Sequence, residues 1–153
     1  MTFSLKSSAF TEGQRIPIPF TCLGANLSPP LNWNGAPSGT QEFALISDDP
    51  DAPMGTWAHW VIYKIPGKRN NLPEGIFKGD TVKDMGVQGK SSFGVNGYGG
   101  PCPPPGKDHH YYFKLYALSK PLDAHPGMSK DQLLEAMKGL ILGQAQLMGV
   151  FSR

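Results

Sequence analysis

The sequence predicts a mainly β domain, built as a sandwich or a barrel. Glycine and proline are frequent, with 19 and 15 among 153 residues, which predicts many turns and few long helices. Between these turn residues lie several short runs of β-branched and aromatic residues, at the spacing typical of sandwiches and barrels. A single segment has a convincing helical pattern. These three observations favour an all-β body with little helix.

Four short runs carry the strand prediction. Each is apolar or rich in the residue types that favour strands, and each is followed by turn-forming residues. In chain order they are residues 2–7, 43–47, 57–65 and 111–118. The last run is the strongest because it combines four aromatic residues with leucine and alanine.

A short helix is predicted after Ser129, which is a good N-cap residue. Gln132 stands three residues further on, as a capping box prefers. Leu133 and Met137 then repeat at helical spacing, and Gly139 can end the helix.

The run of residues 140–150 is ambiguous between helix and strand. Gly143 and Gly149 disfavour a helix. Gln144 and Gln146 would share one face at a period of two, which is the period of a strand. We therefore favour a strand for this run.

Composition limits the classes of function. A chain of this length suits one domain, spanning residues 1–153. The 14 Lys and Arg residues against 12 Asp and Glu residues give a formal charge of +2, without a basic run of five or more, so nothing indicates nucleic-acid binding. No apolar stretch approaches the ~20 residues that a membrane helix needs, so we expect no integral membrane segment.

The cellular location is inferred from weaker signals. The amino-terminal residues lack the charged start and apolar core of a signal peptide, so we expect a cytoplasmic protein. Cys22 and Cys102 are too few for a disulfide framework, so we expect free thiols.

A stiff acidic loop follows one of the predicted strands. Asp49 and Asp51 are bracketed by Pro50 and Pro53, which have a fixed φ and push the preceding residue to extended geometry. The two carboxylates therefore cannot lie on a helix. His59 follows within the next predicted strand. A rigid loop at the ends of buried strands is a common location for a small-molecule site.

A second unusual segment is the loop of residues 97–106, in which eight of ten residues are Gly or Pro. Glycines let backbone N–H groups approach an anion closely, and prolines hold the loop in one shape. The loop runs into His109 and Tyr111, which point to the same face of a strand because they are two residues apart. These residue types suit a phosphate or another small oxyanion.

The motifs together resemble the phosphatidylethanolamine-binding protein family, and in particular its bacterial and archaeal Raf-kinase-inhibitor-like branch. The motifs are Asp49-Pro-Asp-Ala-Pro53, Trp57-x-His59, the loop Tyr98-Gly-Gly-Pro-Cys-Pro-Pro and His109-x-Tyr111. The resemblance covers nearly the whole chain. It implies a β-sandwich of antiparallel sheets with one or two short helices.

The resemblance also implies a ligand pocket and a homodimer. The expected pocket residues are Asp49, Asp51, Pro53, Trp57, His59, Gly100, Pro101, His109 and Tyr111. No metal or cofactor is implied, and no His-x-x-x-His or Cys-x-x-Cys pattern supports one. Animal members carry a further C-terminal helix near the pocket. Its absence here predicts a more open pocket, or one closed by a partner subunit.

Several positions remain open in this interpretation. Asp49 and Asp51 could simply stabilise turns, and His59 could be a core residue. The Ala52–Pro53 bond is a candidate for the cis form. Gln146 and Phe151 stand where relatives often carry glutamate and tyrosine, which puts dimer contacts in doubt more than ligand binding.

We expect a non-catalytic protein that binds a small anion or phosphate headgroup. The aspartates would repel an anion, and two resolutions are open. The histidines could be protonated, or the ligand could be zwitterionic like phosphoethanolamine, with its ammonium on the aspartates. Two alternative functions are an inhibitor of a serine protease or kinase, as some relatives are, and an Asp/His acid–base hydrolase of phosphoesters.

Overall fold

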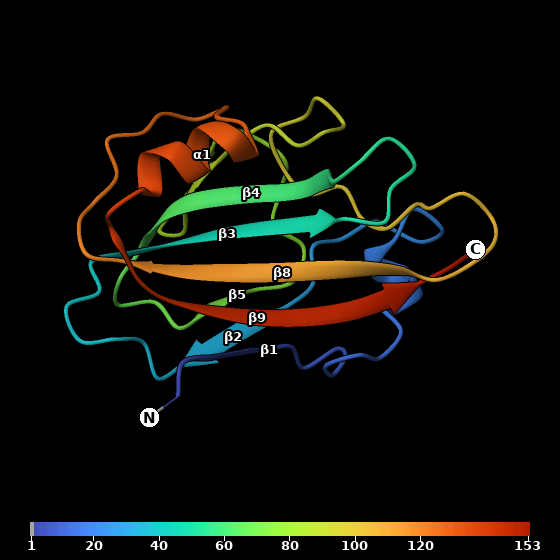
Figure 1. Ribbon diagram of the computed structural model, residues 1–153, viewed down its shortest axis with the longest axis horizontal. Helices are drawn as coiled ribbons and strands as arrows, with labels where there is room; N and C mark the ends of the chain where they lie inside the picture. The colour runs from blue at the N-terminus through green and yellow to red at the C-terminus, as the bar shows by residue number, and fades with distance from the viewer. Residues whose placement is uncertain (1) are drawn as a thin grey trace.

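The computed structural model describes residues 2–153, which form two antiparallel β-sheets and one α-helix (Figure 1). In spatial order the large sheet consists of β6 (Thr81–Val82), β7 (Gly86–Gln88), β4 (Trp57–Pro66), β3 (Glu42–Asp49), β8 (His109–Leu118) and β9 (Ile141–Phe151). The small sheet consists of β1 (Ser4–Lys6), β2 (Leu31–Asn34) and β5 (Asn71–Leu72). The predicted mainly β class is confirmed.

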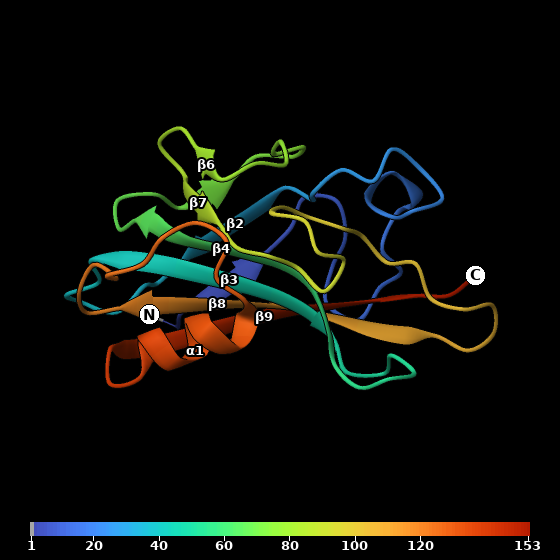
Figure 2. The same cartoon turned by 90° about the horizontal axis from the view of Figure 1, so that it is seen from above.

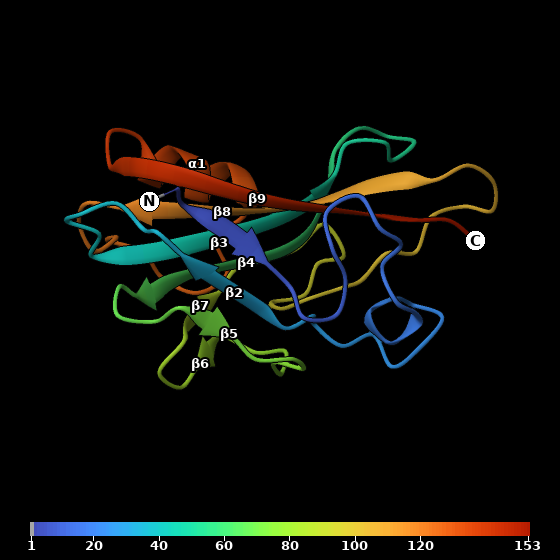
Figure 3. The ribbon, with the colours of Figure 1, turned by 90° about the horizontal axis from the view of Figure 1, so that it is seen from below.

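The large sheet lies between two apolar layers. On one face, Phe43 of β3 packs with Trp33 of the small sheet, with the ring centroids 5.3 Å apart. On the other face, Ile46 of β3 belongs to a second apolar cluster with Leu133 of α1 (Lys130–Met137). Figures 2 and 3 show α1 and the small sheet on opposite sides of β3 and β8. Because both faces of β3 are covered, its residues 43–46 are all apolar, without alternation.

The predicted helix is confirmed together with its capping box. The Ser129 hydroxyl accepts a hydrogen bond from the backbone N–H of Gln132 at 3.2 Å. The Gln132 side chain accepts one from the Ser129 backbone at 2.9 Å. The helix ends at Met137, and Gly139 adopts a φ of +78° two residues later. Within residues 2–153, no helix is long and apolar enough to cross a membrane.

The ambiguous C-terminal run is a strand, as favoured. β9 pairs with β8 along its length, from Ile141 opposite Leu118 to Phe151 opposite His109. Gly149 serves close packing, because a Cβ there would come within 2.6 Å of the Ile16 side chain. Gly149 therefore lets Ile16 pack directly on the backbone of β9.

The expectation of free thiols is wrong. Cys22 and Cys102 form a disulfide across a sequence separation of 80 residues, with their Cα atoms 5.4 Å apart. Cys22 follows the short 3₁₀ helix η1 (Ile18–Phe20), and Cys102 lies in the Gly/Pro-rich loop. The two loops meet at one end of the sandwich, where the Cys22 backbone N–H also donates to the Pro101 carbonyl. Sequence spacing carries no signal of this proximity.

Three strand ends meet at one end of the large sheet. Because β3 runs antiparallel to both β4 and β8, its carboxyl end meets their amino ends. Asp49 at the end of β3 lies opposite Trp57 at the start of β4. His109 is the first residue of β8, on the other side of β3. In Figure 1 this is the end of the molecule nearest the C terminus.

Candidate ligand-binding site

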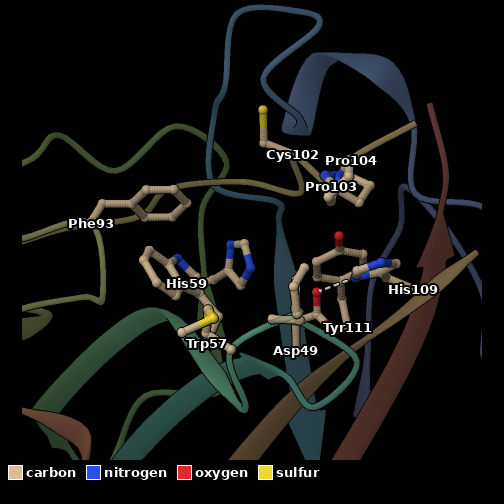
Figure 4. Close-up of a pocket in the computed structure, with 12 residues that line it drawn as sticks. Asp49, Trp57, His59, Phe93, Cys102, Pro103, Pro104, His109 and Tyr111 are labelled. Atoms are coloured by element: carbon tan, nitrogen blue, oxygen red, sulfur yellow. Dashed lines mark hydrogen bonds and ion pairs between the residues drawn. The ribbon is translucent and has the colours of Figure 1, made fainter. Parts of the chain in front are cut away.

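A cavity of about 220 Å³ lies where these three strands end (Figure 4). Side chains at the strand ends supply its polar floor, and three loops supply most of its wall. The twelve lining residues are Asp49, Ala52, Pro53, Met54, Trp57, His59, Phe93, Cys102, Pro103, Pro104, His109 and Tyr111. Six of the nine predicted site residues are among them.

Asp49 and His109 form a buried pair on the floor of the cavity. The Asp49 Oδ2 atom accepts a hydrogen bond from His109 Nδ1 at 2.7 Å, and both residues are buried. Asp49 Oδ1 accepts a second bond from the backbone N–H of Asp51, also at 2.7 Å. The carboxylate is therefore held at both oxygens, and the His109 ring is fixed with its Nδ1 proton on Asp49.

His59 is also fixed by a hydrogen bond at Nδ1. This atom donates to the Gly99 carbonyl at 2.6 Å, because a carbonyl can only accept. Burial lowers the pKa of His59 below its usual value, although the Gly99 carbonyl and the charge of Asp49 oppose this shift. The ring is therefore neutral near pH 7, with its proton on Nδ1 and an acceptor lone pair on Nε2.

Tyr111 contributes a hydroxyl group that has no hydrogen-bond partner among residues 2–153. The residue is only 1% exposed and lies edge-on against the His59 ring, with the centroids 5.2 Å apart. Burial, then the charge of Asp49 and the closeness of its carboxylate to the hydroxyl, raise the pKa of Tyr111 well above its usual value, although the two groups do not form a hydrogen bond of normal geometry. The hydroxyl thus keeps its proton, and an unpartnered buried donor is uncommon in a folded protein.

Aromatic side chains cover one side of the cavity. Phe93 packs edge-on against Trp57 at 5.5 Å and against His59 at 5.3 Å, measured between ring centroids. Pro103 and Pro104 line the cavity from the Gly/Pro-rich loop. The site thus combines a few polar groups with a largely apolar wall, as small-molecule pockets usually do.

Asp51 does not line the cavity, contrary to the prediction. Its Oδ2 atom accepts hydrogen bonds from the His110 backbone N–H at 2.8 Å and from His110 Nδ1 at 2.7 Å. These hydrogen bonds to His110 lower the pKa of the Asp51 carboxyl. The side chain turns outward because His110 is on the opposite face of β8 from His109. Asp51 and His110, to which sequence reasoning assigned no role, tie the acidic loop to β8.

The acidic loop has the ordinary trans geometry. No peptide bond in residues 2–153 is cis, so the Ala52–Pro53 bond is trans. Pro53 and Ala52 both line the cavity, while the neighbouring Met54 side chain lines it and is also 93% exposed.

Gly100 and Pro101 also lie outside the cavity, and the predicted anion cradle of amides is not formed. The Gly99 N–H donates to the His59 carbonyl at 2.9 Å, and the Gly100 N–H donates to Asn26 Oδ1 at 2.8 Å. A Cβ on Gly100 would come within 2.1 Å of the Phe20 carbonyl oxygen. These glycines are thus required for close packing of the loop, and their N–H groups are used within the protein.

Sequence reasoning missed six lining residues, namely Ala52, Met54, Phe93, Cys102, Pro103 and Pro104. Four of them lie in the two loops that the sequence indicated, where other residues of the same loop were selected. Met54 directly follows Pro53, the last residue of the acidic motif. Phe93 gave no signal, because the turn of residues 91–94 has an ordinary Ser-Ser-Phe-Gly sequence. Among residues 2–153, no three His, Cys, Asp or Glu side chains are grouped so as to hold a metal ion.

The fold and the cavity define an antiparallel β-sandwich protein with a small-molecule pocket at one end of its main sheet. The sequence model of the family described as phosphatidylethanolamine-binding protein matches residues 6–152. The chain therefore belongs to the phosphatidylethanolamine-binding protein family, as its motifs indicated.

Similar proteins agree with this assignment. A "UPF0098 protein" of Methanothermobacter thermautotrophicus is 49% identical over 150 residues, which cover 98% of this chain and 99% of that protein. The crystal structure of Escherichia coli YbcL, described as a member of the mammalian PEBP family, aligns with a TM-score of 0.92 at 32% identity, covering 100% of this chain and 99% of YbcL. The homologue CT736 of Chlamydia trachomatis aligns with a TM-score of 0.90 at 39% identity, covering 99% and 98%. These relatives place the chain in the bacterial and archaeal branch.

Proposed function

We propose that the cavity reversibly binds a small phosphate-bearing ligand and performs no chemistry on it. The observation that supports this most directly is the Tyr111 hydroxyl, a buried donor without a protein partner at the floor of the cavity. An oxygen atom of a ligand would satisfy it. The two imidazole rings stand beside it, and neither uses its Nε2 atom in a hydrogen bond within residues 2–153.

The three polar groups suit a phosphate monoanion. Tyr111 donates to one phosphate oxygen. His109 is held by Asp49 at Nδ1, which leaves its Nε2 atom for a hydrogen bond with a second phosphate oxygen. His59 is neutral, so its Nε2 atom accepts a hydrogen bond from the P–OH group of the phosphate. The hydrogen bonds that both Asp49 oxygens accept lessen the repulsion between Asp49 and an anion, without a charged His59.

The structure weakens the proposed role of the aspartates in recognising an ammonium group. Asp51 points away from the cavity, and both oxygens of Asp49 already accept a hydrogen bond. A cationic headgroup attached to the phosphate would instead lie against the faces of Trp57 and Phe93, where cation–π attraction is available. A quaternary ammonium would therefore bind at least as well as a primary one.

The possible nucleophiles beside the cavity are not activated. Cys102 is held in the disulfide, and the raised pKa of Tyr111 makes its phenolate inaccessible near pH 7. No serine or threonine lines the cavity. A ligand in this site thus meets hydrogen-bonding groups but no activated nucleophile.

Calorimetric titration with inorganic phosphate, phosphoethanolamine and phosphocholine tests the proposal. We expect saturable binding, weakened in Tyr111→Phe by about 1.5–3 kcal/mol, the usual contribution of a hydrogen bond to a charged group. Tyr112→Phe is the matched control, since Tyr112 points to the other face of β8. No binding of any of the three compounds would exclude the proposal.

The aspartates are compared in the same titration. The substitutions Asp51→Asn and Asp49→Asn each remove one negative charge, but only Asp49 lines the cavity. We expect Asp51→Asn to leave the ratio of the phosphoethanolamine and phosphate affinities unchanged. A changed ratio in this variant alone would restore Asp51 as an ammonium ligand.

A phosphoesterase is the second candidate, because the buried Asp49–His109 pair is the arrangement of a general base. Water would then have to be the nucleophile. Hydrolysis of a phosphomonoester or phosphodiester by the purified protein, lost in His109→Gln, would favour this function. Inhibition of a protease or kinase and a homodimer remain predictions from the family resemblance, and inhibition assays and light scattering test them.

A further inference from the structure

A second cavity of about 180 Å³ lies directly behind the first. Phe93 and Cys102 line both cavities, and Phe93 stands on the side of the first cavity away from His109 (Figure 4). Gly99 at the floor of the second cavity lacks a Cβ, which would otherwise lie 2.5 Å from the Phe93 ring. The two spaces are thus separated by the Phe93 ring and the half-cystine Cys102.

The Phe93 ring between the two cavities can move. The residue is 45% exposed, and its ring makes edge-on contacts with Trp57 and His59 and packs over Gly99. Its backbone lies in a turn closed by the hydrogen bond from Gly94 N–H to the Ser91 carbonyl. Rotation about the side-chain bonds of an exposed residue is fast and leaves such a turn intact. A ligand entering from the first cavity can therefore displace the ring.

The second cavity carries one positive charge at its edge. Lys78 is the single charged residue among those that line it, and no acidic side chain in residues 2–153 lies within ion-pairing distance of Lys78. The aliphatic part of Lys78 lies over Gly97, where an added Cβ would come within 2.8 Å of Lys78 Cγ. The first carbons of the Lys78 side chain thus pack on the Gly97 backbone beside the cavity.

We propose that the two cavities form one bipartite site for an organic phosphate whose apolar substituent passes Phe93 and ends in a second anionic group near Lys78. This inference rests on the proposed function of the first cavity, which holds the phosphate. The apolar part of the substituent lies against Phe93 and Val95, and the terminal anion pairs with the Lys78 ammonium. The site thus selects for length and for charge at both ends.

Three compounds separate the parts of this proposal in one calorimetric series. Ethyl phosphate fills the first cavity, hexyl phosphate adds an apolar chain, and 6-(phosphonooxy)hexanoate adds a carboxylate at the end of the same chain. We expect hexyl phosphate to bind more tightly than ethyl phosphate by about two- to fourfold for each methylene that becomes buried. The carboxylate should add a further factor of about two to five, the range of a partly exposed ion pair.

Two variants assign these gains to the second cavity. Lys78→Gln should remove the gain from the carboxylate and leave hexyl phosphate unaffected. Val95→Trp should fill the second cavity and remove the gain from the chain, while ethyl phosphate binds as before, because Val95 does not line the first cavity. Lys120→Gln is the matched control, since Lys120 is an exposed lysine that lines neither cavity.

The outcomes distinguish the two proposals. Binding of ethyl phosphate without any gain from chain or carboxylate would overturn the bipartite site and keep the phosphate site. A gain from the chain alone, unchanged in Lys78→Gln, would overturn the second anion and indicate a ligand with a neutral tail. Failure of ethyl phosphate and of both longer compounds to bind would overturn both proposals.

Discussion

His59 carries a pH dependence that can be measured separately from ligand binding. Its pKa is lowered in the folded protein, chiefly by burial, whereas the unfolded chain has the ordinary value of 6.5. Below pH 6.5 the His59 imidazole therefore binds a proton in the unfolded state but not in the folded state. The stability that His59 contributes is thus complete above about pH 6.5 and is lost as the pH falls toward the folded-state pKa.

We therefore expect the free energy of unfolding in urea to decrease between pH 7.5 and pH 5.5. The decrease should be smaller in His59→Gln, which cannot titrate. The lowered pKa of Asp51 acts in a different window, because its contribution is lost only below its ordinary value of 3.8. An equal pH dependence in the wild type and in His59→Gln would contradict the assigned neutral ring.

Tyr111 and Tyr98 give opposite expectations for the same substitution. Tyr111→Phe removes an unpartnered buried hydroxyl, so we expect the free energy of unfolding to stay unchanged or to rise by up to about 1 kcal/mol. Tyr98→Phe removes the hydrogen bond to the Phe20 carbonyl at 2.7 Å and should lower it by about 1–2 kcal/mol.

Chemical denaturation of the two variants without ligand checks this pair. A loss of stability in Tyr111→Phe as large as in Tyr98→Phe would show that the Tyr111 hydroxyl has a structural partner. The argument for a ligand at this position would then fail, whatever the titrations with phosphate compounds show.

Helix α1 depends on local chemistry that the sequence displays. The capping box of α1 is visible in the spacing of Ser129 and Gln132, and it forms as predicted. Ser129→Ala should lower the free energy of unfolding by about 1 kcal/mol. Ser8→Ala, at an exposed serine, is the matched control and should have little effect. Equal effects of the two substitutions in urea denaturation would contradict the cap.

The acidic loop depends on longer-range chemistry. Its two aspartates are two residues apart and chemically alike, yet Asp49 turns into the cavity to His109 and Asp51 turns outward to His110. The alternation of β8 sends the two histidines to opposite faces, and each aspartate follows its own partner. The loop sequence alone could not separate the two roles, because the choice is made by the neighbouring strand.

On the scale of the whole molecule, the disulfide joins the two loops that meet beside the cavity. Its closure across 80 residues should stabilise the protein by about 4 kcal/mol in the chain-entropy account. The loops are also joined by hydrogen bonds from Tyr98 to Phe20 and from Gly100 to Asn26. We therefore expect reduction to lower the melting temperature substantially while the protein remains folded at 25 °C.

Thermal unfolding with and without a phosphine reductant measures this effect, and Cys22→Ser with Cys102→Ser is the matched double variant. An unchanged melting temperature in the reduced protein and in the double variant would contradict the stabilising role.

The sequence by itself determined the class of fold, the helix and its cap, the main strands, and half of the residues that line the cavity. These features depend on local patterns, namely turn residues, the periods of strand and helix, and motifs that are each shorter than about ten residues. The family assignment follows from the same motifs, because their order along the chain is as informative as their composition.

Only the tertiary structure decided which groups meet. The pairing of Cys22 with Cys102, the outward turn of Asp51, the use of the Gly99 and Gly100 amides within the protein and the place of Phe93 between two cavities all depend on segments distant in sequence. Strand register and loop packing set these contacts. No residue carries a local signal for a partner that the fold brings to it from 40 to 80 positions away.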